Sequence, residues 1–154
     1  MFSKTLTIIK KILVSLITSF LVLLFAYAAG SKLGGYHLFK FQLGKSPYTM
    51  HYAGIISWAL PLAEFIIVAL LVVKKTKIYG LYASFFLMFL FTGYIYALLH
   101  YSYYVPCSCG GILSGMDWHQ HLKFNVIVTI CTLTAIFLDN PTASINIIEE
   151  PNFV

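Results

Sequence analysis

The sequence contains no arginine and few acidic residues. Its ten basic residues are all lysines, and only five Asp and Glu residues stand against them, which gives a formal net charge of +5. Nucleic-acid-binding surfaces usually rely on arginine, whose planar guanidinium makes paired hydrogen bonds to base edges. The absence of arginine therefore argues against a nucleic-acid partner.

Charged residues of either sign are scarce. They make up 10% of the 154 residues, whereas hydrophobic residues make up 60%, and an ordinary soluble domain carries roughly a quarter charged residues. A chain of this length forms one domain, whose core cannot bury so much apolar surface. Much of that surface must face lipid, so we expect a single membrane domain over residues 1–154, surrounded by a lipid bilayer.

Four apolar runs are long enough to cross a bilayer, which takes about 20 residues in a helix. The predicted spans are residues 12–30, 52–73, 78–100 and 121–138. A cleaved signal peptide is the alternative for the first run, because Ala26-Tyr27-Ala28 resembles a cleavage site, although the run is long for one. Residues 36–43 mix aromatics with lysine and suit a short segment in the membrane interface. Short connections favour an all-α, up-down bundle of four transmembrane helices.

The distribution of lysines predicts the orientation of the chain. Four spans place both termini on one side, together with the turn between the second and third spans. That side carries Lys4, Lys10, Lys11, Lys74, Lys75 and Lys77. The positive-inside rule makes it cytoplasmic, so the loop before the last span is predicted to be extracytoplasmic.

That extracytoplasmic loop contains Cys107 and Cys109, which are separated by one residue. They can close only a very small ring, so a disulfide between them would be strained and easily reduced. Disulfides also form and persist outside the cytoplasm. A thiol–disulfide exchange site is the leading interpretation. A structural role stays open, as does a zinc or copper site formed by Cys107, Cys109, His119 and His121.

Glu64 is the only acidic residue inside a predicted span, near the middle of the second. A charge at that depth costs about 2.5–3.5 kcal/mol, so Glu64 must be neutral, paired or beside water. Lys32, at the outer end of the first span, is the candidate partner. Pro61 lies one turn earlier and frees a backbone carbonyl nearby. Glu64 could relay protons or could fix helix packing.

Trp118, His121 and Asn125 share one helix face at the start of the last span, because they are spaced at i, i+3 and i+7. This face could wall the cysteine loop or contact a bound headgroup. Alternatively, it holds an interfacial tryptophan and interhelical hydrogen bonds. His119 lies off the face.

Three motifs occur in order: Gly30-x-Lys32-Leu33, Pro61-x-x-Glu64, and Pro106-Cys107-Ser108-Cys109-Gly110-Gly111 followed by Trp118, His121 and Asn125. Over residues 25–138 this pattern resembles the MauE branch of the DoxX-like membrane proteins, closest to the redox-associated members of Bacteroidetes-type bacteria. The resemblance implies a four-helix bundle in the bacterial inner membrane, with a periplasmic cysteine loop. It also implies a link to methylamine utilisation, through the maturation of methylamine dehydrogenase, where many disulfides form outside the cytoplasm.

A broader similarity to the DsbB and vitamin K epoxide reductase architecture implies electron transfer between thiols and a quinone. Those enzymes use two cysteine pairs, whereas this chain has one pair plus Cys131. A relay between two pairs is therefore not available within one chain.

The resulting hypothesis is a membrane-embedded thiol–disulfide redox protein that acts on extracytoplasmic partner proteins through Cys107 and Cys109. A quinone is the candidate electron acceptor, Glu64 the proton carrier, and Lys32 and Pro61 supporting residues. The redox direction stays open. The alternatives are a non-catalytic scaffold subunit of a larger extracytoplasmic complex and a carrier of small solutes or metals.

Overall fold

The computed structural model describes residues 2–102 and 117–139, and within these ranges all the regular structure is helical. The elements in chain order are α1 (Phe2–Gly34), α2 (Tyr36–Lys45), the 3-10 helix η1 (Met50–Tyr52), α3 (Ala53–Val72), α4 (Lys77–Tyr101) and α5 (Trp118–Asp139). In the described ranges, α1, α3, α4 and α5 are long and apolar enough to cross a membrane. The prediction of an all-α protein with four spans is confirmed; the predicted Cys-x-Cys loop falls outside the described residues.

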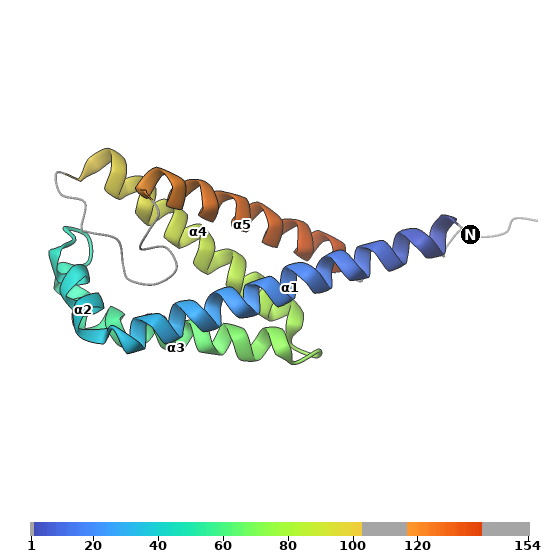
Figure 1. Ribbon diagram of the computed structural model, residues 1–154, viewed down its shortest axis with the longest axis horizontal. Coiled ribbons are helices and arrows are strands. Elements are labelled where there is room, and N and C mark those ends of the chain that lie inside the picture. The colour runs from blue at the N-terminus through green and yellow to red at the C-terminus, as the bar shows by residue number, and fades with distance from the viewer. Residues whose placement is uncertain (1, 103–116, 140–154) are drawn as a thin grey trace, which may run out of the picture.

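The four long helices run alternately up and down in a bundle (Figure 1). Helix α1 packs against α3 and α5, and α4 packs against the same two helices. One end of the bundle holds the turn between α3 and α4 together with the end of α5, and the start of α1 projects beyond it. The other end, which we call the α2 end, holds α2, the end of α4 and the start of α5.

Helix α1 is longer than a membrane span requires. Its 33 residues reach about 50 Å at the helical rise of about 1.5 Å per residue, whereas the hydrocarbon core is about 30 Å thick. The side chains of residues 5–13 are all exposed, and Val14 is the first buried one. The first turns of α1, with Lys10 and Lys11, therefore extend past the rest of the bundle (Figure 1).

The core of the bundle consists of one inward face from each long helix. Its buried residues are Leu21, Phe25, Ile67, Leu71, Leu81, Met88, Val128, Ala135 and Ile136. The outward faces are apolar as well, with Leu23, Ile55 and Phe137 each about 70% exposed (71%, 70% and 69%). Apolar side chains on both faces are the pattern expected of helices that pack on one side and meet lipid on the other.

Small hydroxyl residues are buried in this core without leaving their polar groups unpaired. Thr18 donates to the carbonyl of Val14 at 2.8 Å, and Ser84 donates to the carbonyl of Gly80 at 2.7 Å. In both bonds the accepting carbonyl belongs to the same helix as the hydroxyl and lies one turn earlier. They satisfy the hydroxyl where no water is available, and the small side chains let the helices approach.

Helices α3 and α4 approach closely beside the turn that joins them. The hydroxyl of Thr76 donates to the carbonyl of Leu70 at 3.0 Å and so closes the end of α3. Four residues later, a Cβ atom on Gly80 would lie 2.9 Å from both the Cδ2 atom and the backbone nitrogen of Leu71. Only glycine fits at position 80 without moving backbone.

We therefore expect Gly80→Ala to lower the stability of the purified protein by about 1–3 kcal/mol, the usual cost of overpacking a core. The measurement is the midpoint of thermal unfolding in detergent micelles. Gly93→Ala is the matched control, because Gly93 lies in the same helix and a Cβ there meets nothing within 4 Å. The control should keep its midpoint or raise it slightly; equal effects of both variants would contradict the close approach.

Candidate functional site

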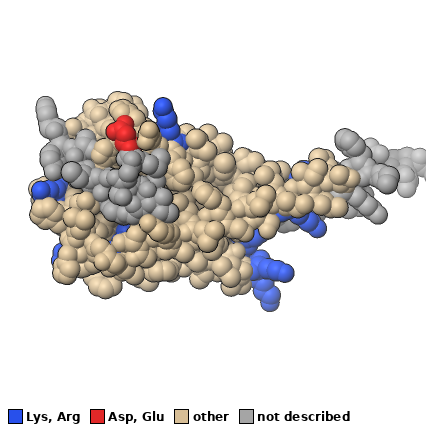
Figure 2. All heavy atoms as spheres, in the orientation of Figure 1, with Lys and Arg blue, Asp and Glu red and all other residues tan. Residues whose placement is uncertain are grey.

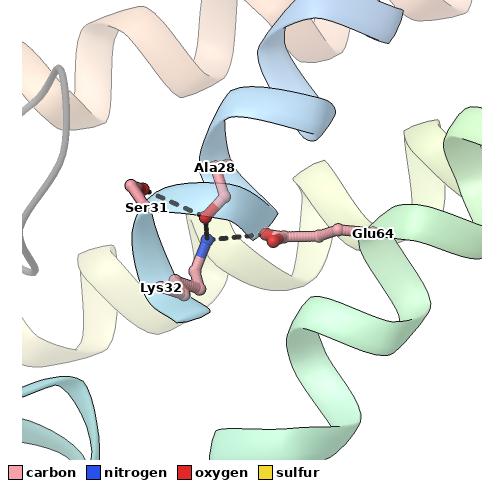
Figure 3. Close-up of polar contacts among 4 residues, drawn as sticks. All are labelled: Ala28, Ser31, Lys32 and Glu64. Carbon is pink, nitrogen blue, oxygen red and sulfur yellow. Dashed lines mark hydrogen bonds and ion pairs between the residues drawn. The ribbon is translucent and has the colours of Figure 1, made fainter. Parts of the chain in front are cut away.

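An ion pair between Lys32 and Glu64 is buried where α1 packs on α3. The Nζ atom of Lys32 lies 2.7 Å from Oε1 of Glu64, and the side chains are 13% and 1% exposed, respectively. Nζ also donates to the backbone carbonyl of Ala28 at 3.2 Å (Figure 3). The pairing predicted from the sequence is therefore present in the structure.

The direction of the Lys32 side chain follows from helix geometry. Side chains tilt toward the N-terminus of their helix, so the ammonium lies beside Ala28, one turn before its own Cα. Ser31 donates to the same Ala28 carbonyl at 3.1 Å (Figure 3). Lys32 thus turns back along α1 toward Glu64 rather than outward to solvent.

The Lys32 ammonium, at the end of α1, lies close to residues of α2, α3 and α4. The ring centroids of Phe39 in α2 and Phe91 in α4 lie 6.0 and 5.9 Å from Nζ. At about 6 Å a cation–π contact is at the outer limit of its range, so the ion pair with Glu64 is the main interaction of this ammonium.

Helix α3 presents Glu64 from a buried face that also carries Ser57 and Pro61, spaced at i, i+4 and i+7. Pro61 has no backbone N–H, so it leaves the carbonyl of Ser57 without its helical donor. The hydroxyl of Ser57 is hydrogen-bonded to the carbonyl of Gly54 at 2.9 Å and to the hydroxyl of Tyr36 at 3.2 Å. These contacts join the start of α2 to α3 two turns before Glu64.

One oxygen of Glu64 is buried without a partner. Among the described residues, no group donates a hydrogen bond to Oε2. An unsatisfied buried acceptor costs about 1–3 kcal/mol, and more when it is charged. Glu64 therefore retains the capacity to accept a proton or a hydrogen bond at an atom that solvent does not reach.

The face of α5 that carries Trp118, His121 and Asn125 is turned toward the inside of the bundle, as the spacing of these residues predicts. Asn125 is buried, Trp118 and His121 are half-buried with ring centroids 6.1 Å apart, and His119 is exposed. Within the described residues, neither Trp118 nor Asn125 makes a hydrogen bond or ring contact with Lys32 or Glu64.

The cysteine pair that the sequence singles out, Cys107 and Cys109, lies outside the described residues. The helix ends on either side of it, Tyr101 and Trp118, lie at the α2 end of the bundle (Figure 1). Cys131 is described: it is a free thiol on an exposed face of α5. In residues 2–102 and 117–139, no three His, Cys, Asp or Glu side chains are grouped to hold a metal; the predicted metal set includes the two cysteines beyond this range.

Several residues around the site are not identified by the sequence reasoning. Phe39, Phe91 and Tyr36 belong to a chain with 13 Phe and 11 Tyr residues, so no single aromatic stands out. Ser46 is fully buried and accepts a hydrogen bond from the hydroxyl of Tyr94 at 2.9 Å, which ties α4 to the segment after α2. No local pattern marks that contact.

The fold and this buried ion pair define a class, that of small multi-pass membrane proteins built on four apolar helices. Residues 10–138 match the family described as methylamine utilisation protein MauE, so the chain belongs to the MauE family. Membership confirms the resemblance seen in the sequence and supports a membrane protein in methylamine utilisation. No curated protein and no solved structure matches the chain.

Breaking the buried pair from either side should destabilise the protein strongly, because it leaves one charge without its partner. We expect Lys32→Met or Glu64→Gln alone to cost about 3 kcal/mol, the lower end for buried pairs because Lys32 keeps slight exposure. The double variant should cost less than the sum, since its two sites are coupled. Unfolding in detergent micelles measures all three.

The control is a second ion pair, Lys77 with Asp139, which joins α4 to α5 at 2.7 Å with side chains 29% and 22% exposed. Asp139→Asn should cost clearly less than either change at the buried pair, because the Lys77–Asp139 pair is more exposed to solvent. Two results would contradict a coupled, buried pair: additive losses of unfolding free energy in the Lys32 and Glu64 variants, or equal losses at the two ion pairs.

Proposed function

We propose that this protein is a membrane-embedded thiol–disulfide redox protein that oxidises the thiols of an extracytoplasmic partner through Cys107 and Cys109. The observation that carries the proposal is the position of the buried Lys32–Glu64 pair. The end of α4 and the start of α5, which flank the cysteine pair in the sequence, both lie at the α2 end of the same bundle. A buried carboxylate with one unpaired oxygen is a suitable proton acceptor for thiol oxidation.

The exchange step follows ordinary thiol chemistry. A partner thiolate attacks one sulfur of the Cys107–Cys109 disulfide; that S–S bond breaks, a mixed disulfide forms, and the other cysteine leaves as a thiolate. A second partner thiolate then attacks the mixed disulfide and releases the first cysteine. The partner loses two electrons and gains a disulfide, and Cys107 and Cys109 become two reduced thiols.

The proposed location is the bacterial inner membrane, with both termini cytoplasmic. The support is the lysine bias: Lys10, Lys11, Lys74 and Lys75 gather on the side opposite to the α2 end. The cysteine pair then belongs to the periplasmic side, where disulfides persist. In this proposal the partner is an extracytoplasmic protein of methylamine utilisation whose disulfides form outside the cytoplasm; the family description supports the link to methylamine utilisation.

To act again, the reduced cysteine pair must lose two electrons and two protons. A bound quinone could accept the two electrons and the two protons. The residues that would hold such a head group are Lys32, whose ammonium can donate a hydrogen bond to an oxygen, Glu64, whose Oε2 is a buried acceptor, and the aromatic Phe39 and Phe91. In this proposal Glu64 receives protons released from the thiols, and Lys32 balances the charge of the carboxylate.

A second candidate function is a non-catalytic scaffold for a larger extracytoplasmic complex. The observation that favours it is that residues of α1, α2, α3 and α4 come together around the Lys32 ammonium, because a buried ion pair can serve mainly to fix packing. In that case the cysteines are structural, and their loss leaves function intact once the bundle has assembled.

Replacing the cysteines separates the two candidates. We expect Cys107→Ser or Cys109→Ser to abolish oxidation of a reduced partner, because each removes one half of the exchanging disulfide. One of the two single variants should also accumulate a mixed disulfide with its partner, since the resolving thiol is gone. Non-reducing gels of cells expressing each variant, followed by identification of the trapped protein, provide the measurement.

Cys131→Ser is the matched control, because it removes the third thiol from an exposed position on α5; it should leave exchange unchanged. Full cellular function of the Cys107→Ser/Cys109→Ser double variant would refute the redox proposal and support the scaffold. A reduction potential for the pair below about −300 mV, in the range of structural disulfides, would also count against exchange.

A further inference from the structure

The outer face of α2 borders a groove that the redox proposal does not use. Its volume is about 460 Å³, and its lining comprises His37, Lys40, Phe41, Gly44, Lys45 and Ala53. The five α2 residues recur at intervals of three and four, so they form one stripe along the helix. Ala53, at the start of α3, forms the opposite wall.

The helix that carries this stripe is fixed in place from behind. Phe39 and Leu43, on the opposite face of α2, are buried against Ala53 of α3 in a small separate core, on which Ile56 and Leu60 also pack. A helix held in this way presents its outer side chains in a constant arrangement. The stripe is therefore a formed surface.

The lining of the groove carries two lysines and no acidic residue. Lys40 and Lys45 are exposed, and the ion pairs among the described residues involve other lysines. Asp117, which is exposed just before α5, lies at the same end of the bundle but does not line the groove. Figure 2 shows both lysine and acidic side chains at the end of the molecule where α2 lies. Two lysines without carboxylate partners on one helix face favour an anionic ligand.

An apolar side chain lies beside these cations: Phe41 is 57% exposed, and the Nζ atom of Lys45 lies 4.3 Å from the centroid of its ring. Leu38, elsewhere on the same helix, is 55% exposed. Gly44 contributes no side chain, so backbone is open between the two lysines. A soluble anion would engage the lysines alone, whereas a molecule with an anionic head and an apolar tail would engage the aromatic side chain as well.

We propose that the α2 groove binds an anionic phospholipid, with its phosphate between Lys40 and Lys45 and its acyl chains against Phe41 and Leu38. The position of α2 at one end of an apolar bundle supports this occupant (Figure 1). A short helix with basic and apolar side chains at that level is typical of the membrane interface. This inference is independent of the redox proposal.

The test uses the full-length protein purified in detergent and titrated with phosphatidylglycerol or phosphatidylcholine of identical acyl chains, with bound lipid counted by native mass spectrometry. One phosphatidylglycerol should bind at least ten-fold more tightly than phosphatidylcholine. Lys40→Gln/Lys45→Gln should weaken phosphatidylglycerol roughly ten- to thirty-fold, from the usual contribution of each lysine near an anionic lipid. Lys40→Arg/Lys45→Arg should bind within about three-fold of wild type, because it keeps both charges.

Two further variants test the groove itself. Lys74→Gln/Lys75→Gln removes the same two charges from exposed positions at the opposite end, and it should leave this tight binding unchanged. Phe41→Ala should weaken phosphatidylglycerol without any change in charge. Equal weakening by both glutamine pairs, equal affinity for the two lipids, or displacement of the lipid by inorganic phosphate alone at millimolar concentration would each overturn the proposal.

Discussion

The ion pair of Lys32 with Glu64 is the constraint around which the described structure is arranged. Separating a charge from water in a lipid-embedded bundle costs several kcal/mol, and only a partner in good geometry offsets that cost. Glu64 lies in the middle of α3, so it requires a cation from another helix, and Lys32 reaches it at 2.7 Å. This contact joins the end of α1 to the middle of α3. The ring centroids of Phe39 and Phe91 lie about 6 Å from the same ammonium.

The same pair links the two functions proposed for the protein. A scaffold needs a buried pair that sets the helix packing, and a redox protein needs a buried group that takes protons when thiols are oxidised. Glu64 can serve both needs because its oxygens differ: Oε1 is bonded to Lys32, whereas Oε2 has no donor among the described residues. Membership of the MauE family supports a membrane protein in methylamine utilisation without choosing between the two.

Sequence reasoning succeeds here where a residue type is rare and fails where it is common. The four spans follow from apolar length, and Lys32 and Glu64 follow from the scarcity of charge in apolar segments. The start of α1 could not be predicted, because its first turns carry lysines and extend beyond the bilayer thickness. Phe91 could not be singled out in a chain with 13 phenylalanines. For Cys107 and Cys109 the spacing indicates the chemistry but not a position relative to Glu64.

In the proposed redox protein, Glu64 serves the redox cycle of Cys107 and Cys109. The most direct measurement is the redox state of these cysteines in intact cells, obtained by rapid acid quenching and alkylation of the assembled protein. The wild type should hold a mixture dominated by the disulfide. Glu64→Gln should accumulate the reduced pair, whereas Asp139→Asn, which removes a carboxylate from the exposed ion pair at the other end, should match the wild type. An assembled Glu64→Gln protein with the wild-type distribution would contradict the account.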